Sequence, residues 1–129
     1  MCDNPTLIAI AVVEHKGRFL VGIRPEETVL AGFSEFPGGK VELDESPAQA
    51  AERECLEETG LEVEVDGEFP EHVHQYDHDQ VRLLFFHCRL KKNDEQPRVP
   101  FRWVDRVGLR SLRFPAGNKS LLALLQKVS

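Results

Sequence analysis

The sequence is short of cysteine, of positive charge and of long hydrophobic runs. Its three cysteines, Cys2, Cys55 and Cys88, show none of the spacings of a metal site, so we expect reduced thiols rather than disulfides. The first apolar run is too short to span a bilayer, and no basic segment precedes it as in a signal peptide. The net charge of −6 argues against general binding to a nucleic acid polymer or an anionic membrane. We therefore expect a cytoplasmic protein with neither partner.

Internal repeats, low-complexity tracts and linkers are also missing from the sequence. A chain of 129 residues with 41% hydrophobic content is long enough to bury one sizeable core. We expect a single domain over residues 1–129. Whether that domain works as a monomer or a homodimer is left open by the sequence.

Apolar runs and alternating patterns indicate a series of strands. The expected strands are residues 6–13, 18–24, 61–65, 81–90 and 102–104, with 68–74 as a weaker candidate beyond a break at Gly67. The polar segments 25–34 and 91–100 are expected loops, and residues 119–128 an expected helix. Strands before and after a helix indicate an α/β domain around a central mixed sheet.

A second helix, in the middle of the chain, has a clear start and a clear end. Ser46 is a good N-cap, Pro47 suits the first helical position, and Gln49 completes a capping box. Gly60 is free to take the left-handed conformation that closes a helix. We therefore expect a helix that starts after Ser46 and ends before Gly60.

Three glutamates, Glu54, Glu57 and Glu58, share one side of this helix. At about 100° per residue their spacing covers roughly a third of the helix circumference. Like charges so close repel one another, so the cluster requires either free exposure to water or a nearby cation. A solvated acidic face is the ordinary interpretation. Adjacent glycines, Gly38 and Gly39, favour a ligand site instead, because glycine lets the backbone approach a ligand closely.

The full spacing is Gly39, five residues, Glu45, seven residues, and then RECLEETGL from Arg53 to Leu61. This pattern, residues 39–61, resembles the Nudix box, the signature of the Nudix hydrolases, position for position. The one departure is Cys55 at a position that is usually aliphatic, and buried cysteine behaves as a small hydrophobe. The resemblance implies the Nudix fold, an α/β/α sandwich around a central mixed sheet. It also implies hydrolysis of a nucleoside diphosphate linked to another moiety, with water and a divalent metal.

The resemblance further implies a metal site. Glu54, Glu57 and Glu58 would be the ligands, with the backbone carbonyl of Gly38, for Mg²⁺ or alternatively Mn²⁺. Hard divalent cations prefer such oxygen ligands. Arg53 is expected to orient a box glutamate, with direct contact to phosphate as the alternative, while Glu45 is expected near the metal site.

The general base is open. MutT-type members of the family use a glutamate on a later loop, and Glu95 is the only glutamate in the corresponding segment here. A glutamate of the box is the alternative base.

Outside the box the chain resembles the MutT-type members, which hydrolyse 8-oxo-dGTP. The segments LAGFSEFPGGK (30–40) and FPAGN (114–118) carry that resemblance. An Asn118 amide offers both a donor and an acceptor, which suits the O6 and protonated N7 of 8-oxoguanine. Its alternative role is a plain helix N-cap. The expected substrate-binding residues are Arg24, Glu35, Phe36, Pro37, Gly38, Lys40 and Asn118.

Several of these assignments have an ordinary alternative. Arg24 and Lys40 are either phosphate contacts or surface cations. Phe36 and Phe114 either flank the base or belong to the core. Val29 stands where MutT-type members carry a histidine.

The histidine-rich stretch 71–80 departs most strongly from those members. His72, His74 and His78 either bind a transition metal or are plain surface, and we favour surface because no zinc-ligand spacing completes the set. Tyr76 is a candidate to stack on a base.

Three functions therefore compete. The first is a metal-dependent nucleoside triphosphate pyrophosphohydrolase that acts on oxidised dGTP. The second is a Nudix hydrolase of another nucleotide: an unmodified or cytidine-type dNTP, a dinucleoside polyphosphate, a nucleotide sugar or an RNA cap. The third is a binding module that has lost catalysis, against which the intact glutamate set argues.

Overall fold

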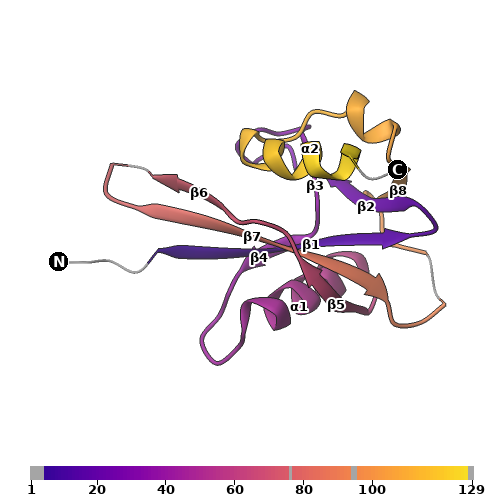
Figure 1. Cartoon of the computed structure of the whole chain (residues 1–129), viewed down its shortest axis with the longest axis horizontal. Helices are drawn as coiled ribbons and strands as arrows, with labels where there is room; N and C mark the ends of the chain where they lie inside the picture. Colours follow the sequence, from indigo (N-terminus) through magenta and orange to yellow (C-terminus); the bar gives the residue numbers. More distant parts are fainter. Residues whose placement is uncertain (1–4, 76, 94–95, 128–129) are drawn as a thin grey trace.

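A computed structural model describes residues 5–75, 77–93 and 96–127 of the chain. One sheet forms its centre, and Figure 1 shows the strands fanning out between two helices. The strands are β1 (Thr6–His15), β2 (Arg18–Ile23), β3 (Ser34–Glu35), β4 (Gly38–Lys40), β5 (Val63–Glu68), β6 (His72–Gln75), β7 (Gln80–Leu90) and β8 (Arg102–Asp105).

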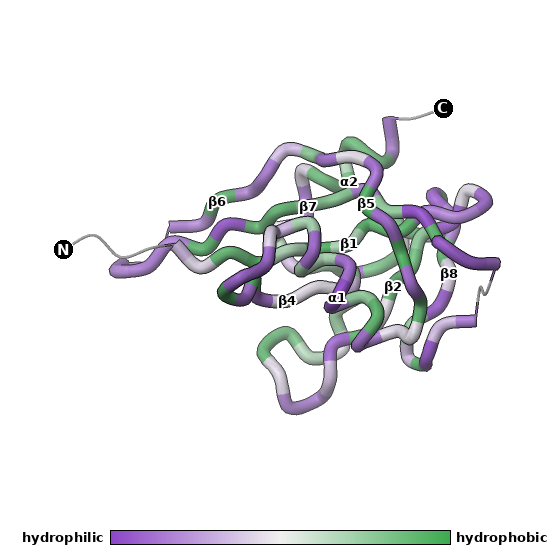
Figure 2. The backbone as a smooth tube through the Cα atoms, turned by 90° about the horizontal axis from the view of Figure 1, so that it is seen from below, coloured by the Kyte–Doolittle hydropathy of each residue, from purple (hydrophilic) through white to green (hydrophobic). Residues whose placement is uncertain are grey.

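The middle of the sheet is a parallel pair, β1 and β7, in register from Thr6 opposite Val81 to Val13 opposite Cys88. The other pairings are antiparallel: β2 and β4 on β1, β3 and β8 on β2, and β5 and β6 on β7. The long apolar runs of β1 and β7 occupy this place because both of their faces are covered. Figure 2 shows the hydrophobic residues concentrated along these strands.

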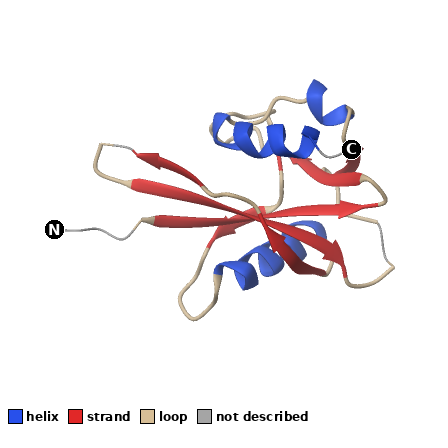
Figure 3. Cartoon of the chain, viewed as in Figure 1, coloured by secondary structure: helices blue, strands red, loops and turns tan. Residues whose placement is uncertain are grey.

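The two helices, α1 (Pro47–Thr59) and α2 (Lys119–Lys127), cover opposite faces of the sheet (Figure 3). Alternate residues of β1 therefore enter two cores. Ala9 and Ala11 pack with Ala51 and Cys55 of α1, while Ile10 and Val12 pack with the α2 side chains Leu121 and Leu125. The expected α/β/α sandwich around a mixed sheet is confirmed.

Helix α1 has the expected ends. The Ser46 hydroxyl accepts the backbone N–H of Gln49 at 3.1 Å, and the Gln49 side chain accepts the backbone N–H of Ser46 at 2.8 Å. Gly60 ends the helix with φ of 80°, and its N–H donates to the carbonyl of Leu56. The capping residues thus fix the direction in which α1 presents its glutamates.

Two local expectations were wrong. Gly67 does not break a strand: β5 runs through it to Glu68 with a register shift between Val65 and Gly67. The carboxylate of Glu52 on α1 accepts the backbone N–H of Val65 at 2.9 Å and supports this irregular place. The weaker strand candidate at 68–74 is shifted as well, since Glu68 belongs to β5 and β6 begins at His72.

Within the described ranges, no helix is long and apolar enough to cross a membrane. The two cysteines that these ranges include, Cys55 and Cys88, are buried free thiols, as expected. They lie in the same core, between α1 and β7.

Candidate active site

A pocket of about 200 Å³ opens between the start of β1 and the segments that precede the two helices. Pockets that enclose a whole drug-sized ligand hold roughly 300–1,000 Å³, so this one has room for part of a ligand. Its lining residues come from β1, β7, the 24–38 segment and the turn before α2: Ile8, Ile10, Arg24, Glu35, Phe36, Gly38, Leu83, Pro115 and Asn118.

Arg24 and Glu35 face each other in this pocket. The Arg24 guanidinium lies 3.3 Å from the Glu35 carboxylate, and its Nε donates to the carbonyl of Val29 at 2.8 Å. Burial raises the pKa of Glu35, while the charge and hydrogen bond of Arg24 partly offset that rise. The pair therefore places one fixed cation and one acceptor at the pocket wall.

Strand β4 connects the pocket to the helix glutamates. Gly38 and Gly39 pair with Ile10 and Ala9 of β1. A β-carbon on Gly39 would lie 2.3–2.9 Å from the carboxyl group of Glu54, and one on Gly38 would lie 2.5 Å from the carbonyl oxygen of Ala9. At Gly38 the β1 backbone leaves no room for a β-carbon, and at Gly39 a β-carbon would have to displace the Glu54 carboxylate.

Glu54 and Glu58 are crowded at this point. Burial, a hydrogen bond with Glu54 and the charges of Glu54 and Glu35 raise the pKa of Glu58 to about 8, while the backbone N–H of Gly38 lowers it. Like charges held together in this way are stabilised by a cation, and carboxylate oxygens suit a hard divalent one. These residues therefore fit a divalent metal ion.

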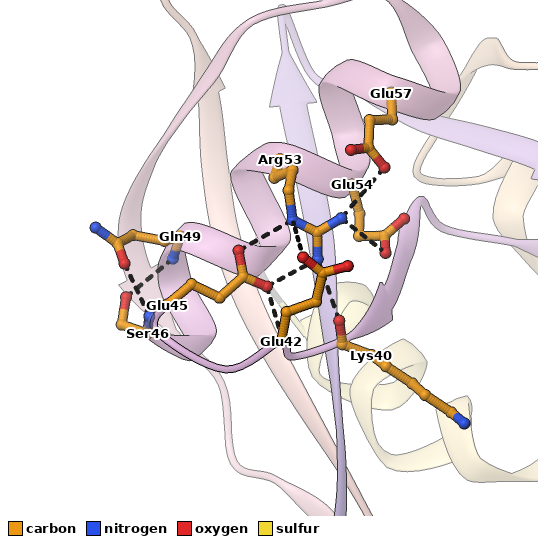
Figure 4. A network of polar contacts seen from close by, with 8 residues as sticks. All are labelled: Lys40, Glu42, Glu45, Ser46, Gln49, Arg53, Glu54 and Glu57. Carbon is orange, nitrogen blue, oxygen red and sulfur yellow. Dashed lines mark hydrogen bonds and ion pairs between the residues drawn. The ribbon is translucent and has the colours of Figure 1, made fainter.

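Arg53 binds several carboxylates of the box (Figure 4). Its guanidinium donates two hydrogen bonds to the Glu45 carboxylate, of 3.0 and 2.8 Å. It also donates to Glu54 at 3.3 Å and to Glu57 at 3.2 Å. It also donates to the carbonyl of Lys40 at 3.2 Å. Hydrogen bonds from Arg53 and from the Glu42 backbone lower the pKa of Glu45 to about 2. Arg53 thereby ties the box loop, β4 and α1 together.

Glu57 is the more exposed of the two α1 glutamates that pair with Arg53. Its side chain is 57% exposed and paired with Arg53. In the described part of the chain, no three His, Cys, Asp or Glu side chains are grouped closely enough to hold a metal ion as they stand. That statement includes His72 and His74, whose rings lie 6.4 Å apart on one face of β6. The three-glutamate metal set remains a prediction.

Asn118 lies at the end of a short 3₁₀ turn, Ala116–Asn118, directly before α2. It is 8% exposed and lines the pocket. Its amide N–H₂ donates to the carbonyl of Pro115 at 3.4 Å, so the side chain turns toward the preceding residues. The base contact of Asn118 remains a prediction.

Phe36 and Phe114 do not flank an open slot. Their rings stack on each other with centroids 5.0 Å apart and an angle of 24° between the planes. Phe36 is 6% exposed and belongs to the core on the α2 side. It also lines the pocket, so it serves as core and wall together.

Two further predicted residues lie beside the pocket rather than in its lining. Pro37 is buried, and its carbonyl accepts the backbone N–H of Ala11 at 2.8 Å. Lys40 has an exposed side chain, and its carbonyl binds Arg53. Glu95 and Tyr76 lie outside the described residues.

Sequence reasoning missed the apolar floor of the pocket. Ile8 and Ile10 are alternate residues of β1, and Leu83 lies directly opposite Ile8 on β7. Their alternation with the residues of the other core was visible in the sequence. The parallel pairing of two distant strands, which brings Leu83 to this place, was not.

The comparisons with known proteins agree with this geometry. A model described as NUDIX domain matches residues 8–124. The chain is 27% identical over 124 residues to an 8-oxo-dGTP diphosphatase of Escherichia coli strain K12, covering 94% of this chain and 96% of that protein. It is 47% identical over 62 residues to a CTP pyrophosphohydrolase of the same strain, covering 48% and 45%.

A solved structure is similar over almost the whole length. It is the solution structure of a DNA mismatch repair protein MutT, of the Nudix hydrolase family, from methicillin-resistant Staphylococcus aureus 252. Its sequence is 26% identical, the TM-score is 0.77, and 98% of each chain is covered. Enzymes of this kind act on nucleotides and generally use a divalent metal. With its box residues gathered around Arg53 and β4, this chain belongs to the Nudix hydrolase family.

Proposed function

We propose that this protein is a Mg²⁺-dependent nucleoside triphosphate pyrophosphohydrolase whose preferred substrate is oxidised dGTP, with Mn²⁺ able to replace Mg²⁺. Water would convert 8-oxo-dGTP to 8-oxo-dGMP and pyrophosphate, a reaction that cleans the nucleotide pool. One observation carries the proposal. The pocket and the carboxylate cluster are contiguous, because Gly38 and Glu35 both line the pocket and both interact with Glu58. The backbone N–H of Gly38 donates a hydrogen bond to the Glu58 carboxylate, and the charge of Glu35 raises the pKa of Glu58.

In this proposal Glu54, Glu57 and Glu58, with the Gly38 carbonyl, hold the metal. A bound divalent ion would neutralise phosphate charge and lower the pKa of a water molecule. Arg53 acts through its partners: by holding Glu45, Glu54 and the Lys40 carbonyl, it keeps the glutamates facing β4. The base that takes the proton from water is either a box glutamate or Glu95.

The pocket would hold the base of the nucleotide. The apolar floor suits a planar ring, and Asn118 at the wall offers the amide carbonyl oxygen and an N–H to its edge. 8-Oxoguanine presents an acceptor at O6 and a donor at N7, whereas guanine presents two acceptors. A site built on hydrogen bonds rejects an analogue that leaves one of them unmatched. Of the two expected phosphate contacts, Arg24 lies in the pocket wall with Glu35, while Lys40 is free to reach the phosphates from the rim.

A cytidine nucleotide is the second candidate substrate. The similarity to a CTP pyrophosphohydrolase, 47% over 62 residues, and the small size of the pocket favour it. A non-catalytic binding module is disfavoured. A module without chemistry has no need of the crowded carboxylates Glu54 and Glu58 beside two glycines.

The test is pyrophosphate release from 8-oxo-dGTP, dGTP, dATP, dTTP, dCTP and CTP at equal concentration with Mg²⁺. We expect a preference for 8-oxo-dGTP over dGTP of about a hundredfold in kcat/KM, which corresponds to roughly 2.7 kcal/mol. A preference for CTP or dCTP would replace the first candidate by the second. Equal slow rates on all six would overturn both and direct the search to dinucleoside polyphosphates or nucleotide sugars.

Other properties expected from the sequence remain predictions. They are the single-domain organisation, the choice between monomer and homodimer, the lack of a nucleic acid polymer or membrane as partner, and the cytoplasmic location.

A further inference from the structure

The β6–β7 hairpin forms a seat for the turn that carries Asn118. His72 of β6 lies directly opposite Leu83 of β7 in an antiparallel pair. Side chains directly opposite each other in such a pair lie on the same face of the sheet. Leu83 packs in the core on the α2 side, so the half-buried His72 is on that side too. Figure 1 shows this hairpin extending the sheet at the end where β1 begins.

Gly117, in the 3₁₀ turn, rests on both of these side chains. A β-carbon at Gly117 would lie 2.7 Å from Leu83 Cδ1 and 3.4 Å from Cδ2 of the His72 ring. Carbon atoms in ordinary contact are about 3.5–4.0 Å apart. The turn therefore lies too close to Leu83 to leave room for a β-carbon, while the His72 ring lies beside it at an ordinary contact distance from that position.

This seat controls two parts of the pocket wall. Asn118 directly follows Gly117, and Leu83 itself lines the pocket. If a side chain at Gly117 pushed the turn away from the hairpin, Asn118 would move with the turn. If the turn stayed in place, the Leu83 side chain would have to move instead. A shift of about 1 Å is enough to spoil a hydrogen bond, whose donor–acceptor distance spans only roughly 2.7–3.2 Å.

We propose that His72 and Gly117 are positioning residues for base recognition, holding Asn118 in place because the turn packs closely beside the Leu83 side chain and the imidazole. This inference rests on the proposed function, in which Asn118 contacts the base. It gives the β6 strand a role in substrate choice, although His72 belongs to neither the Nudix box nor the pocket lining. The role is one of packing, since the His72 ring atom nearest the β-carbon position of Gly117 is a carbon.

The experiment measures steady-state kinetics on 8-oxo-dGTP, dGTP and CTP for His72→Ala and Gly117→Ala. Each has a matched control. His74→Ala removes the next, exposed histidine on the same face of β6. Gly67→Ala places a β-carbon 3.6 Å from its nearest neighbour, an ordinary contact. His72→Phe is the rescue variant, because it keeps a flat ring against Gly117.

We expect both test variants to raise KM for the preferred nucleotide on the order of tenfold while kcat stays within about threefold, since the lost contact binds the base and not the reacting phosphate. The rescue variant and both controls should stay near wild type. An equal fall of kcat on every nucleotide, or an unchanged KM in both test variants, would overturn the proposal.

The side-chain amide resonances of Asn118, recorded by NMR in the free protein, separate this proposal from the proposed function. They should shift in His72→Ala and Gly117→Ala and stay in place in His74→Ala. If the wild type hydrolyses none of the nucleotides, the proposed function fails, and the amide shifts still decide whether the seat holds Asn118. Unchanged shifts in both test variants would refute the seat.

Discussion

Arg53 binds several carboxylates of the candidate site at once. Its planar guanidinium meets the Glu45 carboxylate with two hydrogen bonds and reaches Glu54 and Glu57 with another nitrogen. Lysine has one point charge and no fork, so it is unable to reproduce this geometry. The arginine also holds the end of β4, through the carbonyl of Lys40.

For Arg53→Lys we therefore expect kcat to fall by about 10–100-fold, the usual effect of losing a residue that orients metal ligands. Arg89→Lys is the control, since Arg89 makes an exposed pair with Glu64 at 2.9 Å. Pyrophosphate release measures both. A loss in the control as large as in Arg53→Lys would contradict the orienting role.

His87 lies on β7, four residues along the strand from Leu83 of the pocket. Its two ring nitrogens meet the carboxylates of Asp66 at 2.5 Å and Glu14 at 2.9 Å. Burial disfavours the charged ring, but the hydrogen bonds and charges of Asp66 and Glu14 outweigh burial and raise the pKa of His87. The imidazolium thus joins β5, β7 and β1.

The pKa of His87 in the folded protein is above the value of roughly 6.5 in an unfolded chain. Its contribution to the free energy of unfolding is therefore complete below about pH 6.5 and is lost as the pH rises through the folded-state pKa. The wild type should therefore exceed His87→Gln in urea midpoint by more at pH 6 than at pH 9. Urea unfolding at the two pH values measures this. A difference that grows toward pH 9 would show that the ring is neutral in the folded protein.

At the scale of elements, α1 depends on its two ends. Ser46 satisfies a backbone N–H at the start, and Gly60 takes a left-handed conformation at the end, with φ of 80°. We expect Ser46→Ala to lower the free energy of unfolding by about 1 kcal/mol. Gly60→Ala should lower it by roughly 1–2 kcal/mol. Urea unfolding measures both variants. Ser120→Ala, at an exposed position within α2, is the control. If the Ser46 variant unfolds like this control, the cap does not stabilise α1.

The sequence carried the information for α1 because caps and helical spacing are local. The limits of β5 were harder to predict, since the register shifts there between Val65 and Gly67, with support from Glu52 of another element. For the candidate site, local patterns in the box and the 24–38 segment predicted Arg24, Glu35, Phe36 and Gly38 as neighbours. Leu83 and His72 needed the strand register, which no local pattern contains.

At the scale of the whole molecule, the site spans both faces of the sheet. The pocket floor shares its residues with the core under α2, while Glu54 belongs to α1 on the other face. Strand β4 connects them, because Gly38 lines the pocket and Gly39 lies against the carboxyl group of Glu54. A substrate that has its base on one face and its phosphates near the other fits this arrangement.

The packing of the whole domain also protects its thiols. Burial raises the pKa of Cys55 to about 11 and raises the pKa of Cys88 as well. Since the thiolate is the reactive form, a Cys2→Ser protein should react with a thiol reagent only as fast as it unfolds. The comparison of labelling rates with and without urea tests this. Rapid labelling of the folded protein would mean that the core between α1 and β7 opens locally.

The central claim is that the carboxylates beside Gly38 and Gly39 perform the chemistry. The most direct measurement is pyrophosphate release with Mg²⁺ by Glu58→Gln, beside Glu64→Gln as a surface control and a thermal melt of each. We predict a fall in kcat of at least about a thousandfold for Glu58→Gln, an intact fold, and full activity of the control. Unchanged hydrolysis by Glu58→Gln would contradict the account and place the reaction elsewhere in the molecule.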